Sequence, residues 1–125
     1  MPLLNNGDPK FHTQSVTIAA TATGDDATVV YTVPANFTAV VRYLHFSNSD
    51  SSSRNLTVEF YHAKDAEYKS IAKTLAVAAN TNGHLVNGGY FFLQPGDKIV
   101  AFGSSANKFD ITISCEEYFT SSNLI

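Results

Sequence analysis

Apolar and polar residues alternate along most of this chain, in runs of five to ten residues separated by turn signals. The clearest run places Leu56, Val58 and Phe60 between Thr57, Glu59 and Tyr61. A period of two puts every second side chain on one face of a β-strand. There are about eight such runs at spacings of roughly 8–12 residues, which predicts an all-β antiparallel sandwich or barrel of about eight strands.

Turn residues separate these runs. Pro34-Ala35-Asn36 ends one strand before Thr38–Ser47 begins the next, and Gln94-Pro95-Gly96-Asp97 precedes the strand that starts at Lys98. Proline at the second position and glycine at the third are typical of a type II turn. We therefore expect a tight turn at Pro95-Gly96, with a strand on either side.

The segment Lys64–Val77 fits two patterns. Tyr68, Ile71 and Leu75 have helical spacing, whereas Ile71, Leu75 and Val77 also fall on alternate positions with Lys73. We predict mostly extended structure here, with a helical turn near Ala66–Lys69.

The strand Thr38–Ser47 carries apolar residues on both of its faces. Strict alternation groups Arg42 with one apolar set, Val40, Leu44 and Phe46, and leaves a second set opposite, Ala39, Val41, Tyr43 and His45. A two-layer sandwich buries only one face of each sheet, so the second face predicts a cover from a neighbouring subunit. Arg42 is then an interface anchor, a role in which arginine is enriched. The alternative is an ordinary surface arginine over an edge strand.

The organisation is that of one domain with two short extensions. Pro2, Gly7 and Pro9 favour an irregular, extended N-terminal arm over residues 1–12. The sandwich domain is expected over residues 13–119, with a tail at 120–125. A chain of 125 residues is long enough to bury roughly two-thirds of its unfolded surface without metals or disulfides.

Composition narrows the class of protein. Only 15% of residues are charged, the net charge is −3, and the basic residues are scattered. Nucleic acids and anionic membranes attract clustered positive charge, so neither is an expected partner. There is neither an apolar run of about 20 residues nor a signal-peptide core, and we expect synthesis in a cytoplasm.

Candidate catalytic or metal-binding residues do not combine into a site. His12, His45, His62 and His84 are isolated, without the short spacing typical of metal ligands, although His45 and His62 would face each other if the third and fourth strands pair. Glu116 and Glu117 point to opposite faces of one strand. Cys115 shares a face with Phe109, Ile111 and Ile113 and is predicted to be buried. We therefore expect no enzymatic activity, no cofactor and no metal.

The turns and strands resemble those of small virion structural proteins of tailed bacteriophages, cyanophage proteins among them. The resemblance lies in "YTVPANFTAVVRYLHFSNSD", "NLTVEF" and "VAANTNGHLVNGGYFFLQPGDKIVAFGSSANKFDITISCEEYF". It covers about residues 31–119. The "VPAN" turn, the strand ending in "SN", the "LQPGD" turn and the final alternating strand carry it. Such proteins are β-sandwiches, often jelly-roll-like, that serve as head decoration (cement) proteins or as tail and fibre components.

The resemblance implies a capsid decoration protein on the virion surface, forming trimers and bridging subunits of the major capsid protein. It brings no catalytic residues. By analogy, terminal segments grip the capsid, with apolar anchors at Leu3, Leu4, Phe11, Leu124 and Ile125. Arg42, Tyr43 and His45 join these as expected subunit contacts.

Two other functions remain open from the sequence. One is a tail, adaptor or fibre component of the virion. The other is a carbohydrate-binding module, because sandwiches bind glycans on aromatic platforms; the candidate rings are Tyr31, Tyr43, Tyr61, Tyr90 and Phe92, without any tryptophan.

Overall fold

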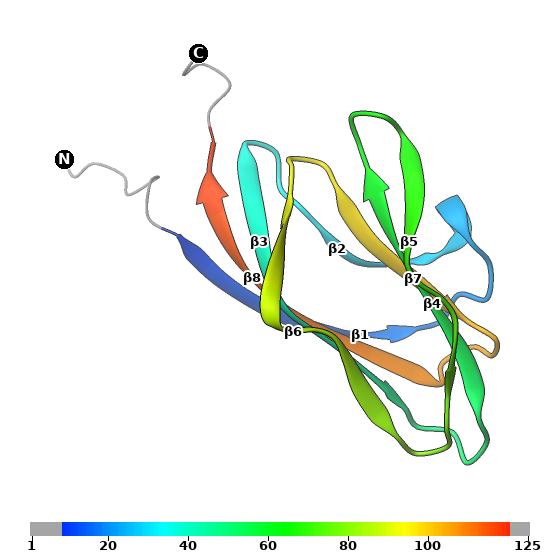
Figure 1. Ribbon diagram of the computed structural model, residues 1–125. Helices are drawn as coiled ribbons and strands as arrows, with labels where there is room; N and C mark the ends of the chain where they lie inside the picture. Colours follow the sequence, from blue (N-terminus) through cyan, green and yellow to red (C-terminus); the bar gives the residue numbers. More distant parts are fainter. Residues whose placement is uncertain (1–8, 121–125) are drawn as a thin grey trace.

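Two four-stranded sheets packed face to face make up the computed structural model, which describes residues 9–120 (Figure 1). The connections are short, and one 3₁₀ turn, η1 (Gly24–Asp26), precedes the second strand. The strands are β1 (Lys10–Ile18), β2 (Thr28–Thr32), β3 (Phe37–Asn48), β4 (Arg54–His62), β5 (Glu67–Val77), β6 (Asn82–Leu93), β7 (Lys98–Gly103) and β8 (Phe109–Phe119). The predicted eight-stranded β-sandwich is confirmed.

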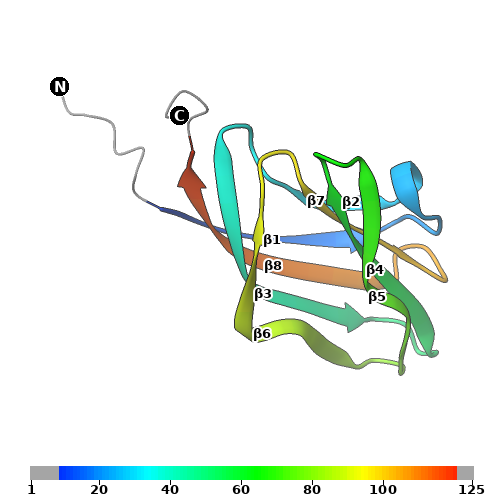
Figure 2. The same ribbon diagram turned by 45° about the horizontal axis from the view of Figure 1, so that its top comes forward.

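The strand order defines the topology. One sheet runs β1-β8-β3-β6 and the other β2-β7-β4-β5, with every neighbouring pair antiparallel. Figure 2 shows β1, β8, β3 and β6 side by side in that order. Consecutive strands cross from one sheet to the other, except for the hairpin between β4 and β5. This is the order of an eight-stranded jelly roll, which consists of two interleaved Greek keys.

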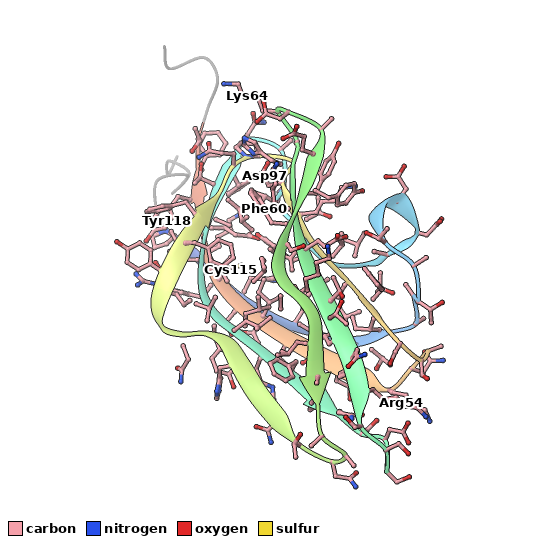
Figure 3. All side chains as sticks on the ribbon, turned by 45° about the vertical axis from the view of Figure 1, so that its right-hand side comes forward. Arg54, Phe60, Lys64, Asp97, Cys115 and Tyr118 are labelled. Carbon is pink, nitrogen blue, oxygen red and sulfur yellow. The ribbon has the colours of Figure 1, made fainter. Side chains whose placement is uncertain are left out.

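The core lies between the two sheets and is formed by alternate residues of their inner faces. In β8 the predicted set is buried together, with Phe109, Ile111 and Ile113 fully inaccessible and Cys115 3% exposed. Cys115 lies between the layers in Figure 3, whereas Tyr118 of the same strand projects outward. The prediction that Cys115 is buried is therefore confirmed, and this burial raises the pKa of its thiol.

The predicted turns form as the sequence indicates. Asn36 adopts φ +68° in the turn before β3, and the amide of Phe37 donates to the carbonyl of Pro34 at 3.1 Å. Gly96 has φ +85°, which a type II turn requires at its third position. The buried carboxylate of Asp97 accepts from the amides of Gln94 (2.8 Å) and Ala63 (2.9 Å), and thereby ties this turn to the β4–β5 hairpin.

The prediction that apolar residues alternate strictly along the third strand is wrong. The pairing register of β3 shifts between Val41 and Tyr43 against both β6 and β8, which is a β-bulge at Arg42. The bulge moves Leu44 and Phe46 onto the same inner face as Ala39 and Val41. Much of the apolar surplus is therefore covered by the opposite sheet, and the argument for a subunit on that ground falls. β3 is also an interior strand, so Arg42 does not lie over an edge strand.

Two further details of the structure differ from the predictions. β1 begins at Lys10, so Phe11 and His12 are strand residues that pair with Glu116 and Cys115. Residues 1–8, in which the rest of the expected N-terminal arm falls, lie outside the described residues. The segment 64–77 is extended as predicted, but the helical turn at Ala66–Lys69 is wrong, because β5 already pairs with β4 from Glu67.

Candidate functional site

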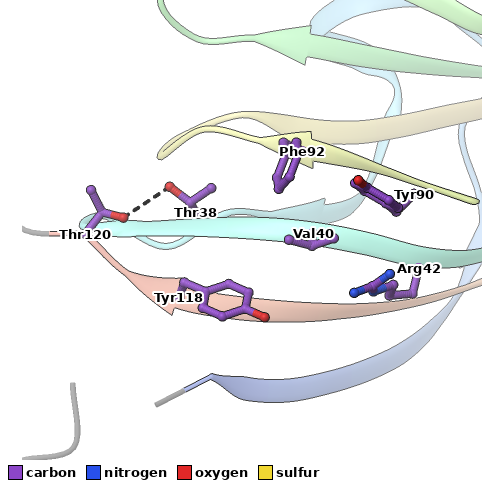
Figure 4. A pocket seen from close by; sticks show the side chains of 7 residues that line it. All are labelled: Thr38, Val40, Arg42, Tyr90, Phe92, Tyr118 and Thr120. Atoms are coloured by element: carbon purple, nitrogen blue, oxygen red, sulfur yellow. Dashed lines mark hydrogen bonds between the residues drawn. The ribbon is translucent and has the colours of Figure 1, made fainter. Parts of the chain in front are cut away.

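The outer face of the β1-β8-β3-β6 sheet carries an open groove at the end where β8 finishes. The groove encloses about 490 Å³ and crosses three strands (Figure 4). Val40 lies on its floor between β6 and β8, and Arg42 lies beside Tyr90. The residues of this outer-face groove are Thr38, Val40, Arg42, Tyr90, Phe92, Tyr118 and Thr120.

Aromatic side chains dominate the walls of the groove. Tyr90 and Phe92 of β6 are each 57% exposed, and their rings meet edge to face with centroids 5.5 Å apart. Tyr118 of β8 is 36% exposed on the opposite wall. Exposed rings that are already packed against each other present a large, preorganised apolar surface to a partner.

Arg42 is held in place from two sides. Its Nε donates to Oε2 of Glu116 at 2.8 Å, and its guanidinium carbon lies 5.1 Å from the centre of the Tyr90 ring. The Tyr118 hydroxyl donates to the other oxygen, Oε1 of Glu116, at 2.6 Å. The side chain of Arg42 nevertheless remains 50% exposed, so it is oriented for contact without being buried.

These contacts shift the ionisation of the groove residues in consistent directions. The Tyr118 hydroxyl, and after it the Arg42 guanidinium, lower the pKa of Glu116. Glu116 in turn raises the pKa of Arg42 and of Tyr118 through the same hydrogen bonds. The charge of Arg42 at the groove is therefore compensated at neutral pH by Glu116 beside it.

A second aromatic group lies further along the same outer face. The rings of Tyr43 and His45 stack with centroids 5.9 Å apart, and His84 of β6 packs against both at 5.2 and 5.1 Å. His45 and His62 do not face each other, because β3 and β4 belong to different sheets. Among residues 9–120, no three His, Cys, Asp or Glu side chains are grouped so that they could hold a metal ion.

The structure brings several of the predicted contact residues onto one surface. Phe11 of β1 is 77% exposed, and it lines a smaller hollow that also includes Arg42 and Glu116. Arg42, Tyr43 and His45 lie on this same outer face, as the bulge at Arg42 requires. The four other expected contacts lie outside the described residues: Leu3, Leu4, Leu124 and Ile125.

Two residues in or beside the groove, Glu116 and Tyr118, were not among the predicted contacts. Both alternate with the buried residues of β8 and therefore point outward, so their position on the outer face could have been predicted from the sequence pattern. Tyr31, a candidate platform residue, is instead 3% exposed and donates its hydroxyl to the Glu117 carboxylate on the inner face. Tyr61 lies on the other sheet, where it packs against Tyr68. Glu116 and Glu117 do point to opposite faces.

Comparison with known proteins leaves the family of this chain open. No protein-family model matches the sequence, and no curated protein matches it. Among solved structures, a similar chain comes from Bacillus endospore appendages, described as a novel family of disulfide-linked pili. It is 18% identical, with a TM-score of 0.46 over 97% of this chain and 98% of that chain. In the described part of this chain, no helix has the length and apolar character needed to cross a membrane.

Proposed function

We propose that this chain is a structural protein of a tailed-phage virion, and specifically a decoration protein that stabilises the head. The observation that carries the proposal is the outer-face groove, where Arg42, Tyr90 and Tyr118 are exposed together on one rigid sheet. Arginine and tyrosine, together with tryptophan, are the residue types enriched among the energetically dominant contacts of protein interfaces. The eight-stranded jelly roll, a fold also found in viral capsid domains, supports the same proposal.

The mechanism is burial of this surface against neighbouring protein. A partner that covers the rings of Tyr90 and Phe92 removes apolar area from water, and the Arg42–Glu116 pair sets orientation at the edge of the contact. The proposed partner at the groove is the major capsid protein, and further copies of this chain are proposed partners through other parts of the surface. Phe11, on the same outer face, extends the contact surface toward β1.

The experiment that tests this proposal is binding to phage heads. Virions of the phage that encodes this chain are separated into heads and tails, and the chain is located by immunogold labelling and by mass spectrometry. We expect it on heads. Its presence on tails would support the tail, adaptor or fibre alternative, and its absence from both would overturn the proposal.

A matched pair of variants then connects the role to the groove. Purified protein is added to heads that lack it, and Tyr90→Ser with Phe92→Ser is compared with Val29→Ser. Val29 is 45% exposed on β2 of the other sheet and serves as the control. We expect the double variant to lose head binding by at least about tenfold, with the control unchanged. Equal binding by both variants would exclude the groove.

A second candidate, saccharide binding, is favoured by the same exposed rings, since sugar rings stack their apolar faces on aromatic side chains. Tyr90, Phe92 and Tyr118 provide such rings, and the hydroxyls of Thr38 and Thr120 lie 3.2 Å apart at the end of the groove. A glycan array with the purified chain tests this alternative. Binding that disappears in the Tyr90→Ser, Phe92→Ser variant would favour it over the structural role.

A further inference from the structure

The four edge strands of the sandwich differ in how they are protected. An exposed edge presents unpaired N–H and C=O groups and can pair with a strand of another molecule. Proteins prevent this with short strands, bulges, prolines or charges along the edge, and a glycine within a strand often marks such a bulge or a bend. The edges here are β1 and β6 in one sheet, and β2 and β5 in the other.

Three of these edges carry such devices. β2 is only five residues long and has a register shift between Val29 and Tyr31. β5 has two register shifts against β4, Thr74 at φ +52°, and charged side chains at Glu67, Lys69 and Lys73. β6 has two register shifts and Gly88 at φ +88°, and Figure 1 shows that it bends sharply.

The edge at β1 has none of these devices beyond a single charge at its start. All nine residues pair with β8 in one unbroken register, from Lys10 opposite Glu117 to Ile18 opposite Phe109. The strand contains no proline and no glycine, and its one charged residue, Lys10, is at its very start. A long, regular and nearly uncharged edge is the form that accepts another strand.

The outer face of β1 is suited to continuing the sheet. Thr13 and Ser15 form hydroxyl pairs with Ser114 (2.8 Å) and Thr112 (2.7 Å) of β8, and Thr17 donates to Asp110 at 2.6 Å. Cross-strand pairs of hydroxyl side chains stabilise neighbouring strands. A further strand rich in serine and threonine would extend the same rows. β1 is itself such a strand.

We propose that β1 pairs antiparallel with β1 of a second copy of this chain. The contact is isologous, since both copies contribute the same edge about a two-fold axis. The register that pairs all nine residues is centred on Gln14, with Thr13 opposite the second copy's Ser15 and Phe11 opposite its Thr17. Main-chain hydrogen bonds provide the affinity, and the two sheets become one sheet of eight strands.

This pairing deepens the proposed function, because it specifies how copies of the chain associate with each other. It rests on the proposed function only in taking self-association as part of the role. Phe11, 77% exposed in the single chain, gains a cross-strand neighbour in the pair. A two-fold contact favours dimers, where the phage resemblance implies trimers. The mass of the assembly therefore distinguishes the dimer from the trimer.

Sedimentation velocity of the purified chain over a range of concentrations tests the pairing. We expect a dimer that Thr13→Lys dissociates, with the dissociation constant raised by at least about tenfold, because lysine on an edge opposes strand pairing. The control is Ser70→Lys, which is also an exposed position but lies on the β5 edge, and it should leave the dimer intact. Ser15→Lys is the second variant, and matched melting temperatures show that each variant is folded.

Cysteine crosslinking tests the register. Residues directly opposite in antiparallel strands have Cβ atoms about 4.5–5.5 Å apart, whereas diagonal neighbours are about 7–8 Å apart. A mixture of Thr13→Cys and Ser15→Cys proteins, with copper phenanthroline as oxidant, should crosslink far faster than either variant alone. The unmodified chain, whose Cys115 is buried, gives the background.

Three results would overturn the proposal. The first is a chain that stays monomeric up to about 100 μM, a concentration at which even weak specific pairs form. The second is a trimer. The third is a dimer that dissociates in Tyr90→Ser, Phe92→Ser but persists in Thr13→Lys, which would place the contact at the groove. A dimer of the expected kind that never binds phage heads would leave the pairing in place and contradict the proposed function instead.

Discussion

The two faces of the β1-β8-β3-β6 sheet are built from the same strands but are held together in different ways. On the inner face, Leu44, Ile111 and Ile113 are fully buried against the opposite sheet. On the outer face, hydrogen bonds and ring contacts between neighbouring strands fix the side chains, as in the Arg42–Glu116 pair. The inner face depends on exclusion of water and the outer face on pairing of polar groups.

This difference assigns stability and recognition to opposite faces. A substitution on the inner face removes buried contacts and opens a cavity, so it weakens folding. A substitution in the groove removes contacts that are half exposed, so it changes little in the free chain and acts mainly on a partner. The two faces are therefore separable by mutation.

The largest expected effect is from Phe109→Ala on the inner face. Phe109 is fully buried, and a Cβ placed on Gly103 would lie only 2.9 Å from its ring, so its surroundings are tightly packed. We expect unfolding in urea to show a loss of about 3–5 kcal/mol in stability. The matched substitution Phe92→Ala, in the groove, should cost less than about 1 kcal/mol, because that ring is 57% exposed. Similar losses for the two variants would remove the distinction between the faces.

How far the sequence predicts this arrangement depends on which residues fix each feature. The strands and the turns at Asn36 and Gly96 follow from local chemistry, since alternation and positive φ are properties of the residues themselves. The bulge at Arg42 does not. Nothing in the local sequence Val40–Tyr43 calls for an extra residue, and the shift appears only in the register that β3 shares with β6 and β8.

The groove was predictable only in parts. The outward direction of Glu116 and Tyr118 follows from the alternation in β8, and Tyr90 and Phe92 alternate in β6. Their meeting requires the strand order, because β3 separates β6 from β8 in the sheet. The sequence therefore contained the side chains of the groove, while the jelly-roll topology, which is non-local, brought them together.

A smaller effect is expected from Asn48→Ala, the one polar exception on the inner face of β3. Asn48 is 2% exposed, and its Nδ2 donates to the carbonyls of Ser52, Val77 and Ala78 at 3.1–3.2 Å. The substitution removes this donor and also the side-chain oxygen that accepts from the amide of Asp50 at 2.9 Å. The loss of several hydrogen bonds made by one buried side chain should cost about 2 kcal/mol. Urea unfolding measures it against Asn82→Ala, an exposed residue of β6. We expect a lower urea midpoint for Asn48→Ala and an unchanged midpoint for Asn82→Ala. Equal midpoints for the two variants would contradict a stabilising role of the buried amide.

The smallest expected effect is from Glu116→Gln on the outer face, and it depends on pH. The Tyr118 hydroxyl and Arg42 lower the pKa of Glu116 in the folded chain below its unfolded value of about 4.3. The ionised carboxylate therefore contributes stability above that unfolded pKa, and the contribution is lost as the pH falls through the folded pKa. The melting temperature of Glu116→Gln should lie slightly below that of the parent at pH 7, with no difference at pH about 2.

Tyr118→Phe provides the control for that measurement, because it removes the largest cause of the lowered pKa while leaving Arg42 in place. In this background the difference between Glu and Gln at position 116 should shrink. A difference that is the same at every pH would show that the carboxylate contributes through shape alone. In that case the ion pair would not hold Arg42, and the orientation of the groove would depend on the Tyr90 ring.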